Sequence, residues 1–206
     1  MEELAIFQYK FVDLPLEQLS IKQKMHRNNL LQLLHNHQPS TSEETLFKQQ
    51  MIEFVQENPT CFERSLLAGH ITGSAWIVDK SHRFTLLTHH RKLNKWFQTG
   101  GHCDGDSKVL NVALKEAHEE TGLTEIQIIS DAIFDIDIHE IPERKGVPSH
   151  LHYDVRFLFE ADISKPLIVS SESSDLTWID LSKVSELNNS QSIMRMVFKV
   201  EKGERR

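Results

Sequence analysis

The chain has 206 residues, of which 39% are hydrophobic, and it carries a formal net charge of −7. That length and apolar content suffice for one hydrophobic core with a small appended element. The acidic balance argues against long RNA or DNA as a partner, because a surface that follows a phosphate backbone is basic. No apolar run approaches the length needed to span a membrane, and the start, Met-Glu-Glu-Leu-Ala, lacks the regions of a signal peptide. We therefore expect a cytoplasmic protein without a long nucleic acid or a membrane as partner.

Residues 1 to 66 are predicted to be helical. Leu16 to His37 carries apolar residues at helical spacing, and Thr41 to Glu44 forms a capping-box pattern before a second helix over Thr45 to Gln56. A proline follows each predicted helix. We interpret this segment as a structural extension or a homodimer element rather than a catalytic domain, and expect the main domain to cover residues 67 to 206.

From Gly69 the residue pattern changes to that of strands. Ile71 to Val78 and Phe84 to Thr88 are predicted to pair around a turn at Asp79 to His82. Trp96 and Phe97 follow, and for such residues core packing is a commoner role than stacking on a base.

The segment from Gly100 to Leu123 is the most informative part of the chain. Glycines punctuate its first residues, Ser107 is placed to cap the start of a helix, and Gly122 is placed to end it. If Val109 is set at zero on a helix that advances about 100° per residue, the apolar side chains cover an arc from roughly 300° round to 140°. The segment therefore predicts a loop followed by an amphipathic helix.

Three carboxylates occupy unexpected positions on that helix. Glu116 and Glu120 fall inside the apolar arc, near about 340° and 20°, and Glu119 lies at its edge near about 280°. For an arbitrary Glu-x-x-Glu-Glu the favoured reading would be a solvated acidic patch, but these positions argue against it. Like charges that are close together and partly desolvated need a compensating cation. Oxygen ligands at this density suit Mg²⁺ or Mn²⁺.

These residues resemble the signature of the Nudix hydrolases, Gly-x5-Glu-x7-Arg-Glu-U-x-Glu-Glu-x-Gly-U, in which U is aliphatic. The match runs from Gly101 to Leu123 and departs from the signature at two positions. Ser107 stands where the family has Glu, and Lys115 stands where it has Arg. Since lysine lacks the planar, bidentate grip of a guanidinium, the helix carboxylates are expected to be held less rigidly. Asp104 or Asp106 is the candidate replacement for the missing acidic group.

The resemblance implies hydrolysis of a diphosphate linkage in a compound of the nucleoside-diphosphate-linked-to-X type, with Mg²⁺ as cofactor and Mn²⁺ as the alternative. It matches Glu119 and Glu120 to metal-binding carboxylates and the carbonyl of Gly100 to a backbone ligand. It matches Glu116 to a metal ligand or a general base. We therefore take Glu116 and Glu119 as candidate catalytic residues, and all four of these residues as candidate metal ligands.

A further metal ligand in this family often comes from a late loop before a Trp-bearing strand. Glu172 is the better candidate here and Asp175 the alternative, with an exposed loop residue as the competing interpretation. For the substrate phosphates, the resemblance places Arg91 and Lys92 near the diphosphate, where their side chains would bind phosphate oxygens, and His102 joins them as a candidate. A solvated turn is the alternative for Arg91 and Lys92.

The remaining elements predict a mixed sheet. Ile126 to Ile138 and His150 to Glu160 have strand character, Leu176 to Ile179 is a short strand, and a final helix is expected over Leu181 to Val200 with a break near Asn188. The predicted fold class is α+β. The resemblance implies an α/β/α sandwich with a mixed β-sheet, to which the N-terminal helical extension is added.

His150 and His152 alternate with apolar residues on one predicted strand, so both lie on the face opposite to Leu151 and Tyr153. A His-x-His pair on a strand can bind zinc. Without a convincing third ligand, a place in the substrate cleft or ordinary polar contacts is the favoured interpretation. The two cysteines of the chain are expected to be free thiols.

Two rival functions remain. The departures at Ser107 and Lys115 also fit a non-catalytic module that binds a nucleotide or regulates a partner. Isomerisation of an isoprenoid diphosphate on the same fold ranks last, because the sequence reveals no catalytic residues for that reaction.

Overall fold

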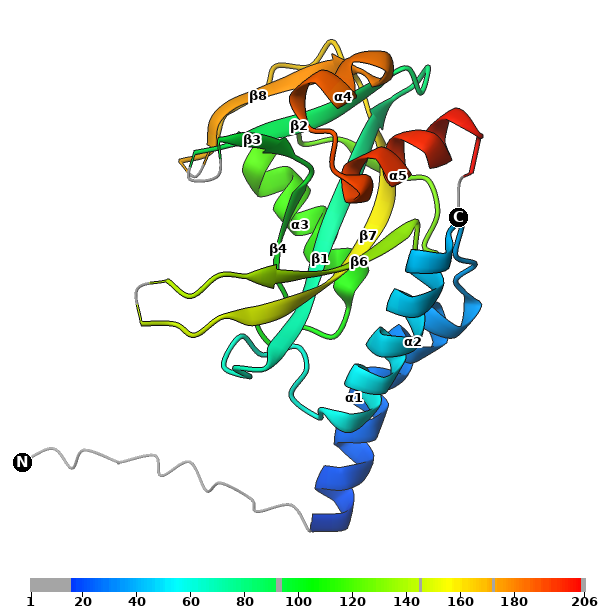
Figure 1. Cartoon of the computed structure of the whole chain (residues 1–206), viewed down its shortest axis with the longest axis vertical. Coiled ribbons are helices and arrows are strands. Elements are labelled where there is room, and N and C mark those ends of the chain that lie inside the picture. The colour runs from blue at the N-terminus through cyan, green and yellow to red at the C-terminus, as the bar shows by residue number, and fades with distance from the viewer. Residues whose placement is uncertain (1–15, 92–93, 145, 172, 205–206) are drawn as a thin grey trace, which may run out of the picture.

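An eight-stranded mixed sheet with helices against both of its faces is the centre of the molecule (Figure 1). The computed structural model describes residues 16–91, 94–144, 146–171 and 173–204. In chain order the helices and strands are α1 (Leu16–Asn36), α2 (Ser42–Glu57), β1 (Gly69–Asp79), β2 (Phe84–His90), β3 (Lys95–Phe97), β4 (Thr99–His102), α3 (Val109–Thr121), β5 (Ile126–Ile128), β6 (Asp135–Ile141), β7 (His150–Ala161), β8 (Ser173–Asp180), α4 (Val184–Leu187) and α5 (Gln191–Glu201). Within the described ranges no helix has the length and apolar character that a bilayer crossing requires.

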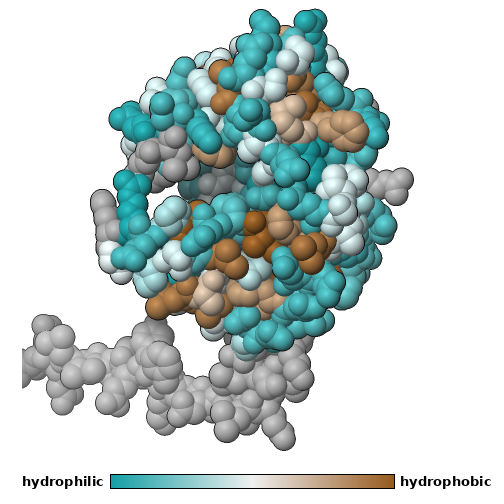
Figure 2. Space-filling model, in the orientation of Figure 1, coloured by the Kyte–Doolittle hydropathy of each residue, from teal (hydrophilic) through white to brown (hydrophobic). Residues whose placement is uncertain are grey.

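Strands β1 and β7 form the axis of the sheet, because they pair in parallel from Gly69 with Leu151 to Asp79 with Ala161. The sheet divides on both sides of this pair. On the free edge of β1, β4 pairs with the first half and β2 with the end. On the free edge of β7, β6 pairs with the first half and β5 with the end. Figure 2 shows the surface hollowed between the part that carries β2 and β8 and the β6–β7 hairpin.

Side chains alternate strictly between the two faces of β1. Ile71, Ala75 and Ile77 belong to the core cluster that also contains residues of α1, α2 and α3. Trp76 and Val78 point to the opposite face, into a second cluster with residues of α4 and α5. The expected α/β/α sandwich is therefore confirmed, as is the N-terminal helical extension.

The two N-terminal helices form as predicted, and the cap of α2 adds a detail. Thr41 is the N-cap, and its side chain accepts a hydrogen bond from the backbone N–H of Glu44 at 3.1 Å. The reciprocal half of a capping box is shifted by one residue, because the Glu44 carboxylate accepts from the N–H of Ser40 at 2.7 Å. That carboxylate is fully buried and has further partners.

Buried charged side chains connect α5 to the sheet and to α2. The ammonium group of Lys199 donates to the carboxylates of Glu44 and Asp135, and the guanidinium groups of Arg195 and Arg156 also donate to Asp135. At most 6% of any of these five residues is exposed. Buried charges persist only when they are paired in this way, so the network fixes how α5 sits against the sheet.

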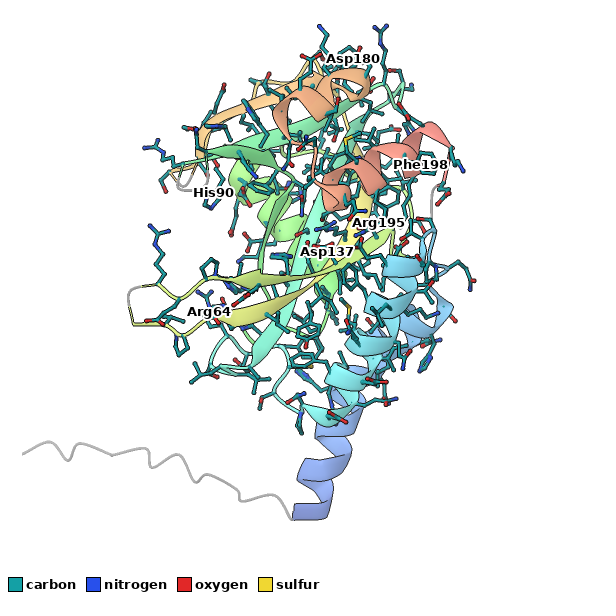
Figure 3. All side chains as sticks on the ribbon, in the orientation of Figure 1. Arg64, His90, Asp137, Asp180, Arg195 and Phe198 are labelled. Atoms are coloured by element: carbon teal, nitrogen blue, oxygen red, sulfur yellow. The ribbon has the colours of Figure 1, made fainter. Side chains whose placement is uncertain are left out.

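Asp137 extends this network, and Figure 3 shows it beside Arg195, between α5 and the sheet. Burial alone would raise the pKa of Asp137, but the charge of Arg156 and the hydrogen bond from His139 outweigh it, so the pKa is well below its ordinary value. The same balance, with His37 and Lys199 as partners, keeps the pKa of Glu44 far below 4.5. Both carboxylates are therefore ionised in the folded protein at neutral pH.

One predicted element differs from the structure, and another is confirmed in detail. The strand expected over Ile126 to Ile138 is two strands, β5 and β6, because polar residues at Ser130 and Asp131 interrupt it before the chain rejoins the sheet, where the N–H of Phe134 donates to Arg156. The final helix is broken, as predicted, at Asn188. Its side chain donates to the carbonyl of Trp96 at 2.8 Å and accepts from the N–H of Ser190 at 3.0 Å.

Candidate active site

The glycines of β4 bring the backbone of this strand against helix α3. Gly101 pairs with Gly73 of β1, where a Cβ atom would lie 2.9 Å from the carbonyl oxygen of Val109. A Cβ atom at Gly101 would lie 2.5 Å from the carboxylate carbon of Glu116. Side chains at these two positions would therefore collide with the helix or its carboxylate. Glycine permits the close approach.

Gly100 makes the second contact between β4 and the helix. Its N–H donates a hydrogen bond of 2.9 Å to Oε1 of Glu120. Glu116 and Glu120 are half-buried, whereas Glu119 is exposed, as the helical arc predicted. The carboxylates of Glu116 and Glu120, one helical turn apart, thus face the backbone of β4, whereas that of Glu119 is exposed to solvent.

Lys115 supplies a positive charge to this acidic helix. Its ammonium nitrogen lies 3.5 Å from Oε2 of Glu119 and 3.9 Å from Oε1 of Glu116. These distances exceed the roughly 2.7–2.9 Å of a strong charge-assisted hydrogen bond. The lysine side chain is 65% exposed. It therefore neutralises the carboxylates as a point charge and does not clamp them.

The start of α3 corrects the prediction for Ser107. The N-cap position belongs to Lys108, which makes no side-chain cap. The carboxylate of Asp106 accepts the Lys108 N–H at 2.8 Å instead, since an aspartate readily bonds the backbone two residues ahead. At the other end, Gly122 has φ 71° and closes the helix, which confirms its predicted role.

Arg64 lies over the signature loop, and sequence reasoning missed it. Its guanidinium donates two hydrogen bonds to the carboxylate of Asp104, which holds the pKa of Asp104 below its ordinary value. The same carboxylate raises the pKa of Arg64, and the charge of Glu116 contributes to that increase. Arg64 comes 40 residues before Asp104 in a segment of turns, so no motif joined the two. Both candidate replacement acids, Asp104 and Asp106, are thus already engaged.

The structure brings two of the predicted peripheral segments together. The guanidinium of Arg91, just after β2, donates a 2.8 Å hydrogen bond to the carbonyl of Ser173 at the start of β8. Lys92 and Glu172 lie outside the described residues. The alternative to Glu172, Asp175, uses its carboxylate locally to accept the N–H of Leu176.

His102, the third candidate for substrate binding, ends β4. Its ring lies among other histidines, 5.0 Å between centroids from His70 and 5.1 Å from His152. Trp96 and Phe97 are partly buried against the second core cluster, which fits the predicted packing role.

The two cysteines, Cys61 and Cys103, are buried free thiols, as predicted. Burial raises the pKa of both, that of Cys61 to about 12. Neither is therefore a reactive thiolate at neutral pH.

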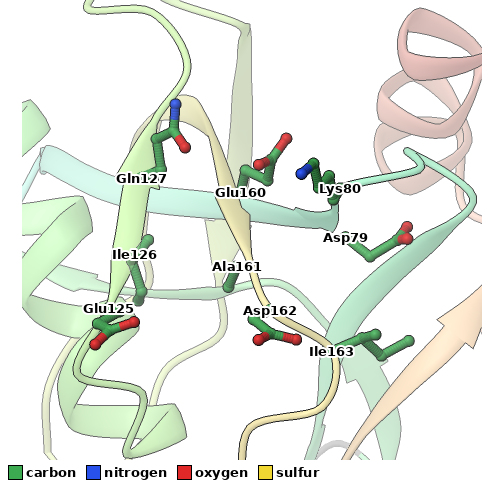
Figure 4. Close-up of a pocket in the computed structure, with 9 residues that line it drawn as sticks. All are labelled: Asp79, Lys80, Glu125, Ile126, Gln127, Glu160, Ala161, Asp162 and Ile163. Atoms are coloured by element: carbon green, nitrogen blue, oxygen red, sulfur yellow. The ribbon is translucent and has the colours of Figure 1, made fainter.

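A hollow of about 500 Å³ opens elsewhere, at the ends of β1 and β7 (Figure 4). It is lined by Asp79, Lys80, Glu125, Ile126, Gln127, Glu160, Ala161, Asp162 and Ile163. Its acidic groups have structural roles: Asp79 accepts hydrogen bonds from the turn that follows β1, and Glu160 lies 3.5 Å from His82. We assign no function to this hollow.

The residues around Gly100 and Gly101 fit a hard divalent cation. The half-buried donors are oxygen atoms of Glu116 and Glu120, the ligand type that Mg²⁺ and Mn²⁺ prefer. The close approach at Gly101 leaves no room for a side chain that would cover the Glu116 carboxylate from the strand side.

An acidic helix set against a glycine-bearing strand, within a mixed sheet between helices, defines a class of hydrolase folds. The chain belongs to the Nudix family, because the family's NUDIX domain model matches residues 70–199. Nudix proteins are pyrophosphohydrolases that act on nucleotide anhydrides and generally use divalent metal ions.

Solved structures agree on the fold. The chain is similar to a C. elegans Ap4A hydrolase in a binary complex, with 17% identity and a TM-score of 0.53, covering 65% of this chain and 96% of that one. It is also similar to the E. coli dihydroneopterin triphosphate pyrophosphohydrolase, with 14% identity and a TM-score of 0.50, covering 63% and 92%. At these identities the similarity concerns the fold alone. No curated protein matches the chain.

Proposed function

We propose that this protein is a Mg²⁺-dependent hydrolase that cleaves the diphosphate linkage of a nucleoside diphosphate linked to X, or of a related small phosphorylated metabolite. The observation that carries the proposal is the contact of two half-buried carboxylates, Glu116 and Glu120, with the backbone of Gly100 and Gly101. Without a cation, that arrangement leaves like charges close together on one helix.

In this proposal Glu116, Glu119 and Glu120 hold the ion together with the carbonyl of Gly100, and Glu172 adds a late ligand. A bound divalent ion would neutralise the diphosphate, polarise phosphorus and lower the pKa of a water molecule. Glu116 and Glu119 are the candidate bases that orient or deprotonate the attacking water.

The phosphate oxygens would be bound by Arg91, Lys92 and His102. The bond from Arg91 to the carbonyl of Ser173 supports this assignment in part, because it holds a guanidinium beside the loop that carries Glu172. The substrate is a small nucleotide or diphosphate compound, and the net charge of −7 disfavours long nucleic acid. We also propose a cytoplasmic location.

Residues 1–66 are proposed to be a structural extension of a domain that covers 67–206. Leu30, Leu34, Met51 and Phe54 of the two helices share the core cluster of the sheet, which favours the structural role over a homodimer element.

A second candidate function is a non-catalytic module that binds or senses a nucleotide. The long distances from the Lys115 ammonium to the carboxylates of Glu116 and Glu119, 3.9 and 3.5 Å, favour this module, because they leave the carboxylates loosely held.

A cleavage assay tests the proposal. The purified chain is incubated with sugar nucleotides, dinucleoside polyphosphates, nucleoside triphosphates and dinucleotide cofactors, with Mg²⁺, with Mn²⁺ and with EDTA. Metal-dependent cleavage that Glu120→Gln removes, and that the exposed control Glu57→Gln retains, supports the hydrolase. If no compound is cleaved and one still raises the melting temperature, the binding module is the better description.

A further inference from the structure

Five histidines from four strands gather at one end of the sheet, on the face of β1 that also carries Trp76. The strand register explains it: His70 on β1 pairs with His152 on β7, and His152 pairs with His139 on β6. His102 on β4 and His150 on β7 complete the group. The ring centroids of neighbouring members lie 4.9 to 5.6 Å apart.

Two members of this histidine cluster have buried ring nitrogens without a hydrogen-bond partner among the described residues. His70 is only 2% exposed, yet neither of its ring nitrogens has a hydrogen-bond partner among the described residues. The backbone of Leu66 favours the protonated ring, but burial and the charges of His102 and His150 outweigh it and lower the pKa of His70. Nε2 of His152 is likewise buried without a partner in the part of the chain that the structure describes. A buried polar atom left without a partner destabilises the fold, so the arrangement indicates a ligand.

The unsatisfied atoms themselves indicate the chemistry of that ligand. They are imidazole nitrogens on neighbouring strands, the atoms through which histidine binds a metal ion.

We propose that His70, His150 and His152 form a binding site for a borderline transition-metal ion of the Zn²⁺ type. One ligand atom from each residue lies within 4.8 Å of the other two. Tetrahedral zinc with Zn–N bonds of about 2.0–2.1 Å needs nitrogens about 3.3 Å apart. The site must therefore contract by about 1.5 Å at most, which is within reach of small side-chain rotations.

Hydrogen bonds to two cluster members match those of metal-binding histidines. Nδ1–H of His150 donates to the carbonyl of Pro148 at 2.9 Å, which fixes the tautomer and leaves Nε2 as the ligand atom. His139 makes the comparable bond from Nδ1 to the carboxylate of Asp137 at 3.1 Å. Metal-ligating histidines typically hold their second nitrogen in this manner. Zinc takes four ligands, which leaves one position for water or for a neighbouring ring.

The proposed site is chemically distinct from the carboxylates of α3, although β4 carries His102 two residues after Gly100. Nitrogen donors favour zinc-like ions over Mg²⁺, whereas carboxylate oxygens suit Mg²⁺ and Mn²⁺. A saturating concentration of Mg²⁺ should therefore occupy only the carboxylates and leave the histidine cluster available.

The experiment uses the full chain, stripped with EDTA and returned to buffer with saturating Mg²⁺. It is titrated with Co²⁺, whose visible d–d bands report tetrahedral nitrogen ligation, and with Zn²⁺ by calorimetry. We expect one equivalent of either ion to bind and the melting temperature to rise. His150→Gln and His152→Gln should each lower the affinity at least tenfold. Glu120→Gln and His35→Gln, the second at an exposed histidine of α1, should bind as the unmodified chain does.

Circular dichroism establishes that each variant is folded, and His150→Gln is the safer variant because its ring is only partly buried. The inference is overturned if no stoichiometric ion binds to the folded chain. It is also overturned if Glu120→Gln abolishes binding while His150→Gln retains it, because the ion then sits on the carboxylates. None of these readouts requires diphosphate cleavage, so the inference can fail or succeed independently of the proposed hydrolase.

Discussion

Replacing Gly101 with alanine should displace one carboxylate of the signature helix without unfolding the protein. The new Cβ would lie 2.5 to 2.8 Å from the three atoms of the Glu116 carboxyl group, where ordinary contacts begin near 3.4 Å. The carboxylate must therefore move by about 1 Å, a displacement that can cost about 10²-fold in rate. That loss corresponds to about 2.7 kcal/mol of transition-state stabilisation. The displaced group is the end of a flexible side chain, so we expect little change in stability.

The assay measures kcat/KM for the best substrate of the cleavage panel, the Mg²⁺ dependence of the rate, and the melting temperature. Gly203→Ala is the matched control, since its Cβ meets no atom within 4 Å. Its left-handed φ of 72° makes it slightly destabilising, but its kcat/KM should be unchanged. A Gly101→Ala protein that keeps kcat/KM within twofold would refute the importance of the Glu116 position. Parallel losses of activity and melting temperature would refute the claim that the site alone is disturbed.

Three other changes are informative. Glu120→Gln should remove most activity with a native circular dichroism spectrum; unaffected turnover would mean that the metal assignment is wrong. Lys115→Arg should maintain or raise kcat, because a guanidinium can grip Glu119 with two hydrogen bonds, and a large loss in the folded variant would contradict this. Glu44→Gln should lower the free energy of unfolding in urea by about 3–5 kcal/mol, because it removes one of the two carboxylates that compensate the buried Lys199 charge. The Glu44 carboxylate has a folded pKa far below its ordinary value of 4.5, so its stabilisation is present above pH 4.5 and is lost as the pH falls below it. Urea titrations at pH 7 and pH 4 should therefore differ less for Glu44→Gln than for the unmodified chain, and an equal pH dependence would count against that pairing.

Local patterns predicted most of the fold. Periodicity located α1, α2, β1, β2 and β7, because each is long enough for its burial pattern to repeat. The pattern failed over 126–138, because Ile129, Ile133 and Phe134 in the link between two short strands continue the apolar pattern on both sides of Ser130 and Asp131. The predicted capping residue of α3, Ser107, was wrong because its neighbour Asp106 can accept the same kind of hydrogen bond from the backbone at the start of the helix.

The parts of the site that were missed depend on contacts between distant segments. Arg64 meets Asp104 across 40 residues, and no periodic signal encodes that approach. His150 and His152 were noticed as a pair, but a third ligand was lacking because a single histidine at the start of β1 is unremarkable alone. Only the parallel register of β1 with β7 puts His70 beside His152.

The buried ion pair of Glu44 and Lys199 also affects how the chain is made. The two residues are 155 positions apart. At about 5–20 residues per second, a ribosome needs about 8–30 s to add Lys199 after Glu44. During that interval the Glu44 carboxylate has His37 and Ser40 as partners but lacks the ammonium group of Lys199. We therefore expect the nascent chain to complete its core only after the last helix has emerged.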